Sequence, residues 1–445
     1  MILPIVFILL ITIGIGLPLT LWISPRHNAI GRLGLSYLLG IGLFTLLMYG
    51  ANLLGFKITF INNLLLFLLF FIPLILFQRE YLKKYWKELI RSLRNLRLPF
   101  VDKVLLGASG FFIASSFINT FYWPVYIWDA LTLYDFRAKV FVQTGFIKSA
   151  LAALGSSYYF GYPLLTSLSH AIVYSLGGNN PQFIYSLFYL SLGLVFYGLL
   201  REFVSRKLSL LFSLMLLTIP QIFNQSVISY TNLPYLTYFS LGVIYYFIWD
   251  RKRSPGYLVF SALLVGLSTW TRSTEPFWLA VFGIVFLTAL YRRKILDVIV
   301  FSLIFFPVQQ VWKNFQSSAG SVGSTLDAVT DSVSILSISN ILNFRRWLEV
   351  ITFLYRGVIL TWGPLFMPFL VAFAYAVVAK KIKNVFLIYL IIFSLLVMFL
   401  IGTFILSFTF PAWSQIPDSA SRTAMIFYPL FVYTVALTFF KEDKT

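Results

Sequence analysis

The chain has 445 residues, of which 59% are hydrophobic and only 11% are charged, and its formal net charge is +19. Soluble domains carry about a quarter charged residues, so the composition excludes a water-soluble fold of this size and indicates a polytopic membrane protein. The sequence has no cysteine, which excludes disulfide scaffolds, Fe–S sites and thiol catalysis, and its two histidines leave little for zinc hydrolysis.

Apolar runs of about 20 residues are needed to cross the hydrocarbon core of a bilayer. The sequence predicts thirteen spanning helices, several of them interrupted by Gly or Pro, which membrane helices tolerate. They are expected near 2–22, 33–55, 58–77, 102–122, 181–200, 207–223, 232–249, 256–271, 276–291, 295–311, 352–379, 385–409 and 423–440. The predicted fold class is therefore an all-α polytopic integral membrane protein with about 13 transmembrane helices.

Most of the 34 basic residues lie in alternate connecting segments of this arrangement. These segments are 26–32, 79–103, 201–207, 251–253, 292–294, 380–383 and 441–444. The positive-inside rule places them in the cytoplasm, so we expect a multi-pass cell-membrane protein with its N terminus outside and its C terminus cytoplasmic. Because the charge of +19 then reflects topology, we exclude nucleic acid as a partner.

One apolar segment, 162–178, is ambiguous. Counting it as a span would place the basic clusters at 251–253 and 292–294 outside, so we expect a short helix lying on the outer surface. The stretch 122–181 then becomes a large external loop carrying surface helices. We divide the chain into a three-helix module (1–77), a cytoplasmic basic amphipathic segment (78–101), a transmembrane core containing that loop (102–311), a second external loop (312–351) and C-terminal helices (352–445).

The ionisable residues outside the cytoplasmic segments lie near the outer ends of the predicted spans and almost never in mid-membrane. Transporters and proton pumps usually place charges or broken helices near the midplane. The distribution therefore favours chemistry at the outer boundary between water and lipid. An enzyme that acts on a lipid-anchored substrate fits this location.

The densest outer segment is 128–139, which predicts an amphipathic helix on the membrane surface. Asp135 precedes Lys139 by four residues, so we expect these two side chains to form a surface ion pair. Asp129 has no basic residue three or four positions later. It fits either the N-cap of this helix or a catalytic carboxylate, and the spacing does not separate these two roles.

The order of several outer motifs resembles the GT-C superfamily of polytopic glycosyltransferases, which use polyprenyl-phosphate sugars. The superfamily includes the protein O-mannosyltransferases, the aminoarabinose transferase of lipid A and the bacterial RgtA/B/C/D-like proteins. The similarity covers roughly 100–295 and 415–440. Its motifs are Trp128-Asp129-Ala130 with Ala138-Lys139, Tyr162-Pro163-Leu164-Leu165, Tyr230-Thr231-Asn232-Leu233-Pro234, Thr271-Arg272-Ser273-Thr274-Glu275, and Ser421-Arg422 ahead of the apolar run to Pro429.

The resemblance implies that Asp129 is the catalytic base, because the first-loop Asp has that role in the superfamily. A carboxylate within hydrogen-bond reach can take the proton of an acceptor hydroxyl as it attacks the anomeric carbon. The leaving phosphate needs cationic partners. The candidates for this role are Arg137, Lys139, Arg272 and Arg422, and for each the alternative is snorkelling towards lipid head groups.

Asn232 departs from the superfamily pattern, which often has an Asp before the Leu-Pro pair. We therefore predict no metal site and no cofactor, while a need for a divalent metal stays open. Glu275 is a secondary candidate that either pairs with Arg272 or caps the following helix. Packing or lipid contact suits His170 better than catalysis. Aromatic residues that could stack on a sugar are Tyr158, Tyr159 and Tyr162.

The sequence thus favours an inverting glycosyltransferase that moves a sugar from a polyprenyl phosphate to an acceptor hydroxyl on the outer side of the membrane. The expected partners are membrane lipid, the lipid-linked donor and a glycan, lipid or protein acceptor. Two alternatives are a transporter or flippase of lipid-linked sugars and a catalytically inactive protein of the same type. We expect Asp129→Asn to abolish transfer and Asp135→Asn to be much milder.

Overall fold

The computed structural model describes residues 2–24, 28–94, 98–153, 159, 162–272, 277–318, 337–410 and 412–440. Across these ranges the chain is helical, with no strand. Among the described residues nine helices are long and apolar enough to cross a membrane, or ten if one bent pair counts as a span. The prediction of an all-α polytopic membrane protein is therefore confirmed. Each of the thirteen predicted spans coincides with helix, but the count of thirteen stays a prediction.

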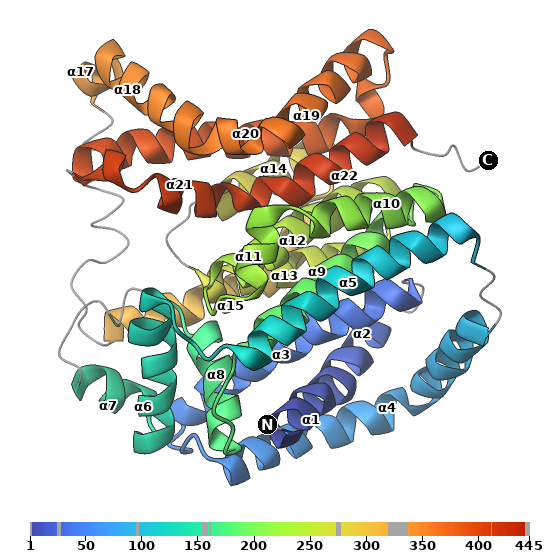
Figure 1. The fold of residues 1–445 in the computed structure, drawn as a ribbon, viewed down its shortest axis with the longest axis vertical. Coiled ribbons are helices and arrows are strands. Elements are labelled where there is room, and N and C mark those ends of the chain that lie inside the picture. The colour runs from blue at the N-terminus through green and yellow to red at the C-terminus, as the bar shows by residue number, and fades with distance from the viewer. Residues whose placement is uncertain are drawn as a thin grey trace.

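The N-terminal helices lie together at the bottom of Figure 1. They are α1 (Ile2–Ile11), the π-helix η1 (Thr12–Gly16), α2 (Leu17–Ile23), α3 (Ala29–Leu53) and α4 (Phe60–Arg94). The Asn28 side chain caps α3 by accepting hydrogen bonds from the Ile30 and Gly31 N–H groups. Because α4 is one continuous helix, the predicted boundary between 77 and 78 falls inside it.

The middle of the molecule is built around α12 (Asn232–Lys252), whose residues from Asn232 to Asp250 are all buried. Helices α9 (Phe183–Leu200), α11 (Pro220–Ser226) and α13 (Pro255–Thr271) contact it. Further out, α5 (Phe100–Tyr122) and α10 (Arg206–Leu217) contact α9, while α15 (Ile295–Ser318) contacts α13 and α14 (Phe277–Tyr291). Helices α10 and α11 meet at 70°. Pro220 opens α11, because a proline is tolerated in a first helical turn but not within a helix.

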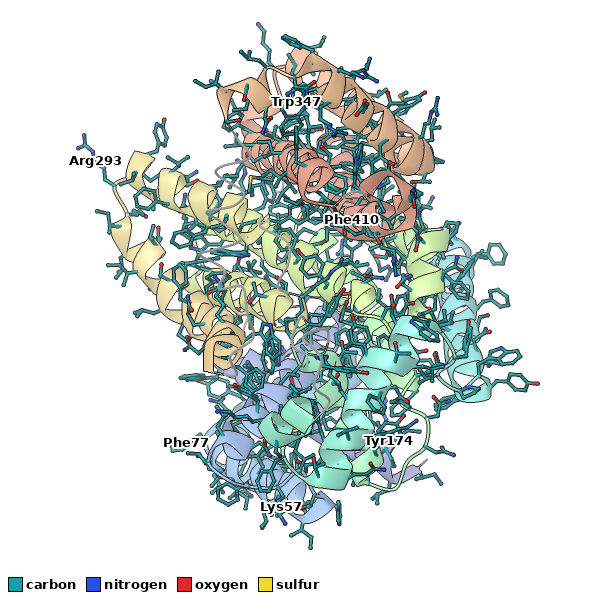
Figure 2. The ribbon with its side chains drawn as sticks, turned by 90° about the vertical axis from the view of Figure 1, so that its left-hand side faces the viewer. Lys57, Phe77, Tyr174, Arg293, Trp347 and Phe410 are labelled. Carbon is teal, nitrogen blue, oxygen red and sulfur yellow. The ribbon has the colours of Figure 1, made fainter. Side chains whose placement is uncertain are left out.

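The C-terminal helices form the top of the view in Figure 1. They are α17 (Ile338–Ile341), α18 (Phe344–Leu354), the π-helix η4 (Tyr355–Ile359), α19 (Leu360–Val378), α20 (Ile382–Thr409), η5 (Trp413–Gln415), α21 (Pro417–Thr423), η6 (Ala424–Ile426) and α22 (Phe427–Phe440). The rings of Trp347 and Phe404 stack with centroids 3.8 Å apart and join α18 to α20. Figure 2 labels Trp347 in this part of the molecule.

Four short helices occupy the predicted external loop. They are the π-helix η2 (Ala130–Asp135), α6 (Phe136–Thr144), α7 (Ile147–Ala153) and α8 (Leu165–Ser175). The expectation that 162–178 lies on the surface is wrong for α8, since its residues Leu165–Val173 are all buried. The helix packs against α3 and α6, and its serines and His170 face protein, which hydropathy alone does not reveal.

Among the described residues, five of the segments predicted to be cytoplasmic are linked by contacts at one end of the helices. Ion pairs join Arg206 to Asp102, Lys252 to Glu202 and Arg292 to Asp250, and Arg251 donates to the Lys383 carbonyl. The segments predicted to be external meet at the opposite end, described below. The structure thus agrees with the predicted alternation of the chain between two ends, and the assignment of each end to a side of the membrane rests on the positive-inside rule.

Candidate functional site

Asp129 directly precedes the π-helix η2 and already has helical backbone angles (φ −62°, ψ −31°). Its side chain is 45% exposed. It makes no capping hydrogen bond, so the N-cap role that the sequence left open lacks its defining contact. A carboxylate in this position is available to a second molecule. Insertions of a π-turn are frequent at functional sites.

Arg422 on α21 brings a positive charge to this carboxylate. Its Nη1 lies 3.9 Å from Asp129 Oδ2, and its Nε lies 3.1 Å from Asp418 Oδ2. The guanidinium also lies over the Tyr230 ring, 5.4 Å from the centroid. Arg422 therefore contacts two segments that are distant in the chain, one through the ion pair with Asp129 and one through the cation–π contact with Tyr230.

Tyr230 completes the surroundings of Asp129. Burial and, to a smaller extent, the negative charge of Asp129 together raise the pKa of Tyr230 to about 12. The phenol therefore keeps its proton at neutral pH and can donate a hydrogen bond. The sequence contained Tyr230 within the matched motif but gave no reason to single it out, because tyrosines are common at membrane interfaces.

Arg272, which follows α13, is held beside this group by two side chains. Its Nη1 donates to Asn232 Oδ1 at 2.9 Å, and its Nη2 donates to Thr423 Oγ1 at 3.5 Å. Asn232 in turn donates from Nδ2 to Gln225 Oε1 at 3.0 Å. Asn232 therefore orients Arg272 through a neutral amide. The structure brings together four predicted positions from separate segments, Asp129, Asn232, Arg272 and Arg422.

A pocket of about 330 Å³ opens beside Arg272. Its walls are mostly apolar and come from α14, α18, α20 and α21. The lining residues include Phe277, Phe353, Met398, Phe399, Leu406, Trp413 and Ile416, with Thr403, Ser419 and Thr423 as the polar contribution. One guanidinium at the margin of an apolar cavity suits a ligand with a hydrocarbon chain and an anionic end.

Asp135 lies six residues after Asp129 in different surroundings. Its carboxylate forms the predicted ion pair with Lys139 at 2.8 Å, accepts a hydrogen bond from the Tyr174 hydroxyl and lies 3.4 Å from His170 Nδ1. Its side chain is only 2% exposed. Burial opposes ionisation, but His170, Lys139 and Tyr174 outweigh that effect and lower the pKa of Asp135 to about 2.

Several other predicted positions have structural contacts. His170 is fully buried, which agrees with the predicted packing role, and its Nε2 lies 3.0 Å from the Tyr185 hydroxyl. The buried Arg137 donates to the carbonyl oxygens of Tyr159, Tyr162 and Pro163 and to Ser167 Oγ. Because this guanidinium is committed to the chain around 159–163, we leave Arg137 out of the proposed site.

The tyrosines near the external loop have packed rings. The Tyr162 ring lies 6.0 Å from the Tyr134 ring, and the Tyr159 ring lies 5.9 Å from that of Phe136. A role for either in stacking on a sugar stays a prediction. Tyr158 and Glu275 lie outside the described residues.

Within the described part of the chain, no group of three or more His, Cys, Asp or Glu residues is close enough to hold a metal ion. Compared with known proteins, the chain matches no family model, no curated protein and no solved structure.

Proposed function

We propose that the protein is a membrane glycosyltransferase of the GT-C type, which transfers a sugar from a polyprenyl phosphate to an acceptor hydroxyl with Asp129 as general base. The observation that carries this proposal is the accessibility of the Asp129 carboxylate beside two arginines. It is a half-exposed carboxylate without a capping bond, and it lies next to Arg422 in a cluster that includes Arg272. The positive-inside rule places this end of the helices on the outer side of the membrane.

The reaction needs three things of this site. Asp129 takes the proton of the acceptor hydroxyl while the hydroxyl oxygen forms a bond to the anomeric carbon. The bond from that carbon to the phosphate oxygen breaks, and its electron pair leaves with the polyprenyl phosphate. Attack opposite the leaving phosphate inverts the anomeric centre. Arg272 and Arg422 supply positive charge for the phosphate as it leaves.

The apolar pocket beside Arg272 supports a lipid-linked donor over a nucleotide sugar. Its apolar residues suit the first isoprene units, and Arg272 stands at its edge to receive the phosphate. A nucleotide donor would instead need polar partners for a ribose and a base. The resemblance to polyprenyl-phosphate-dependent transferases, read from the motif order, agrees with this choice.

The donor reaction is the most direct test of this function. Proteoliposomes holding the full chain would be supplied with radiolabelled polyprenyl-phosphate mannose, glucose or aminoarabinose and with a membrane extract as acceptor source. We expect one of these donors to be consumed, label to appear in a product and free polyprenyl phosphate to accumulate. Intact donor moved to the opposite leaflet would instead show a flippase. The absence of both changes with all three donors would contradict the proposal.

A further inference from the structure

A second groove lies beside the candidate site, between α18 and η4 on one side and η5 and α21 on the other. Its volume is about 870 Å³. Its charged lining consists of Arg346, Glu349 and Arg356, and its opposite wall includes Trp413 and Pro417. It is thus more polar than the pocket beside Arg272 and carries more positive than negative charge.

Glu349 does not cancel the positive charge of this groove. Its carboxylate is shared between Arg346 Nη1 at 2.9 Å and the highly exposed Arg345 Nε at 3.4 Å. Arg356 is exposed, and none of the ion pairs among described residues involves it. The guanidinium groups of Arg346 and Arg356 therefore line this groove, and the single carboxylate of Glu349 is already paired with Arg345 and Arg346. This excess of positive charge favours an anionic ligand.

The π-helix η4 shapes this side of the groove. It places Arg356 in the lining and lets Gly357 pack closely against α21. A Cβ atom added at Gly357 would lie 3.2 Å from Pro417 Cβ, so a larger residue would push the two walls apart. A π-turn is a local insertion that re-aims side chains, and here it directs an arginine into the groove.

An exposed apolar stripe runs along the same helix. Phe344, Leu348, Ile351 and Tyr355 are 78%, 67%, 50% and 51% exposed, and their spacing places them on one helical face. Leu348 also lines the groove. Because α18 begins a candidate membrane span, Phe344–Val378, this stripe lies in the first turns of that span. Figure 1 shows α17 and α18 at a corner of the molecule.

We propose that this groove is a binding site for the head group of an anionic phospholipid. The phosphate would lie between Arg346 and Arg356, and the acyl chains would cover the apolar stripe, which meets the groove at Leu348. Continuity between the charged groove and the apolar stripe is what selects a lipid over a soluble anion. This binding does not depend on the proposed transferase activity.

The groove shares a wall with the apolar pocket beside Arg272. Phe353 and Trp413 line both cavities, and their rings contact each other edge to face at 5.1 Å. Pro417 lines the groove and Arg422 follows it by five residues on the same helix, a rise of about 7–8 Å. If the proposed function holds, a lipid in this groove is therefore placed to act as the acceptor, and that role rests on the proposed function.

Native mass spectrometry of the detergent-solubilised full chain would test the site with phosphatidylglycerol and phosphatidylcholine as probes. We expect preferential binding of phosphatidylglycerol and at least a tenfold loss of its affinity in the Arg346→Gln/Arg356→Gln variant. The matched control is Arg293→Gln/Lys294→Gln, which removes two exposed charges from the opposite end of the helices and should bind normally. Figure 2 shows Arg293 pointing away from the bundle.

Two further arms keep the outcomes separate. Asp129→Asn should bind phosphatidylglycerol as the wild type does, so a failure of the proposed catalysis would leave this result unchanged. Glycerol phosphate should compete only weakly, and Leu348→Gln should weaken lipid binding, because the chains contribute. Equal losses in both double variants, or full displacement by an equimolar amount of glycerol phosphate, would overturn the proposal. The single variant Arg356→Gln replaces the double variant if that one does not fold.

Discussion

Two carboxylates of the same short stretch, Asp129 and Asp135, have opposite surroundings. Asp129 is 45% exposed and has Arg422 as a loose partner at 3.9 Å. Asp135 is 2% exposed and is bound by Lys139, Tyr174 and His170. In the sequence, a single feature distinguished the two residues, namely that Asp135 has a basic residue, Lys139, four positions later.

The difference shows how the same side chain serves reactivity or stability. A base must exchange a proton with a substrate, so its carboxylate needs an open approach and few fixed hydrogen bonds. A buried carboxylate needs its partners, because its charge would otherwise be costly to remove from water. Asp129 meets the first condition and Asp135 the second. The following variants break or sharpen this contrast.

The largest expected effect is on catalysis at Asp129. Asp129→Asn keeps the shape of the side chain but removes its ability to accept a proton, so transfer should fall by about a thousandfold. The thermal unfolding temperature should change little, because Asp129 makes no capping bond and its ion pair with Arg422 is long and partly exposed. Initial rates of transfer from the labelled donor would be measured beside unfolding in detergent. A large loss of stability would mean that Asp129 is structural instead.

Arg137 is expected to give the next largest effect, on stability. Arg137→Gln removes a buried guanidinium that donates to three carbonyl groups, so the free energy of unfolding should fall by about 3 kcal/mol. The exposed Lys148→Gln serves as the control, since none of the ion pairs among the described residues involves Lys148. If Arg137→Gln kept normal stability but lost transfer activity, Arg137 would instead belong to the donor-binding site, as the sequence predicted.

Asp135 should make the protein sensitive to acid. Its folded-state pKa of about 2 lies below its ordinary value of 3.8, so the ionised form stabilises the fold above about pH 4. That stabilisation, about 2 kcal/mol, is lost as the pH falls from about 4 towards 2. Unfolding temperatures at a series of pH values would measure it. The Asp135→Asn variant should be less stable at neutral pH and should lack this part of the pH dependence, and a parallel loss in both proteins would contradict the assignment.

The smallest of these effects is expected at Arg422. Arg422→Gln removes one of two positive charges proposed for the phosphate, so kcat/KM should fall by about tenfold, or about 1.4 kcal/mol. Arg345→Gln is the control, because its side chain is 91% exposed and lies outside the site. Equal rates in both variants would remove Arg422 from the proposed mechanism.

The sequence predicted those features that depend on local spacing and on hydropathy. The described residues form helices over the predicted spans, basic segments contact one another at one end, and Asp135 forms the ion pair with Lys139. The order of motifs also anticipated that Asn232, Arg272 and Arg422 would lie near one another. The first three inferences need only a helical period or the alternation of spans, whereas the last rests on the resemblance to the GT-C superfamily.

Tertiary packing decided the remaining features. The helix α8 has the composition of a surface helix, yet α3 and α6 cover it. Arg137 has the composition of an anion ligand, yet the carbonyl groups that occupy it come from residues more than 20 positions away. The contact of Tyr230 with Arg422 and the groove around Arg356 depend on segments that no local pattern brings together.

The central claim is that Asp129 accepts the proton of the acceptor hydroxyl. It is tested most directly by adding formate, a small external carboxylate, to Asp129→Ala and Asp135→Ala during transfer from the labelled donor. The account predicts that formate raises the rate of Asp129→Ala in a saturable manner and does not change that of Asp135→Ala. The account would be contradicted if Asp129→Ala transferred sugar at the wild-type rate without formate. It would also be contradicted if formate raised the rate of Asp135→Ala and not that of Asp129→Ala.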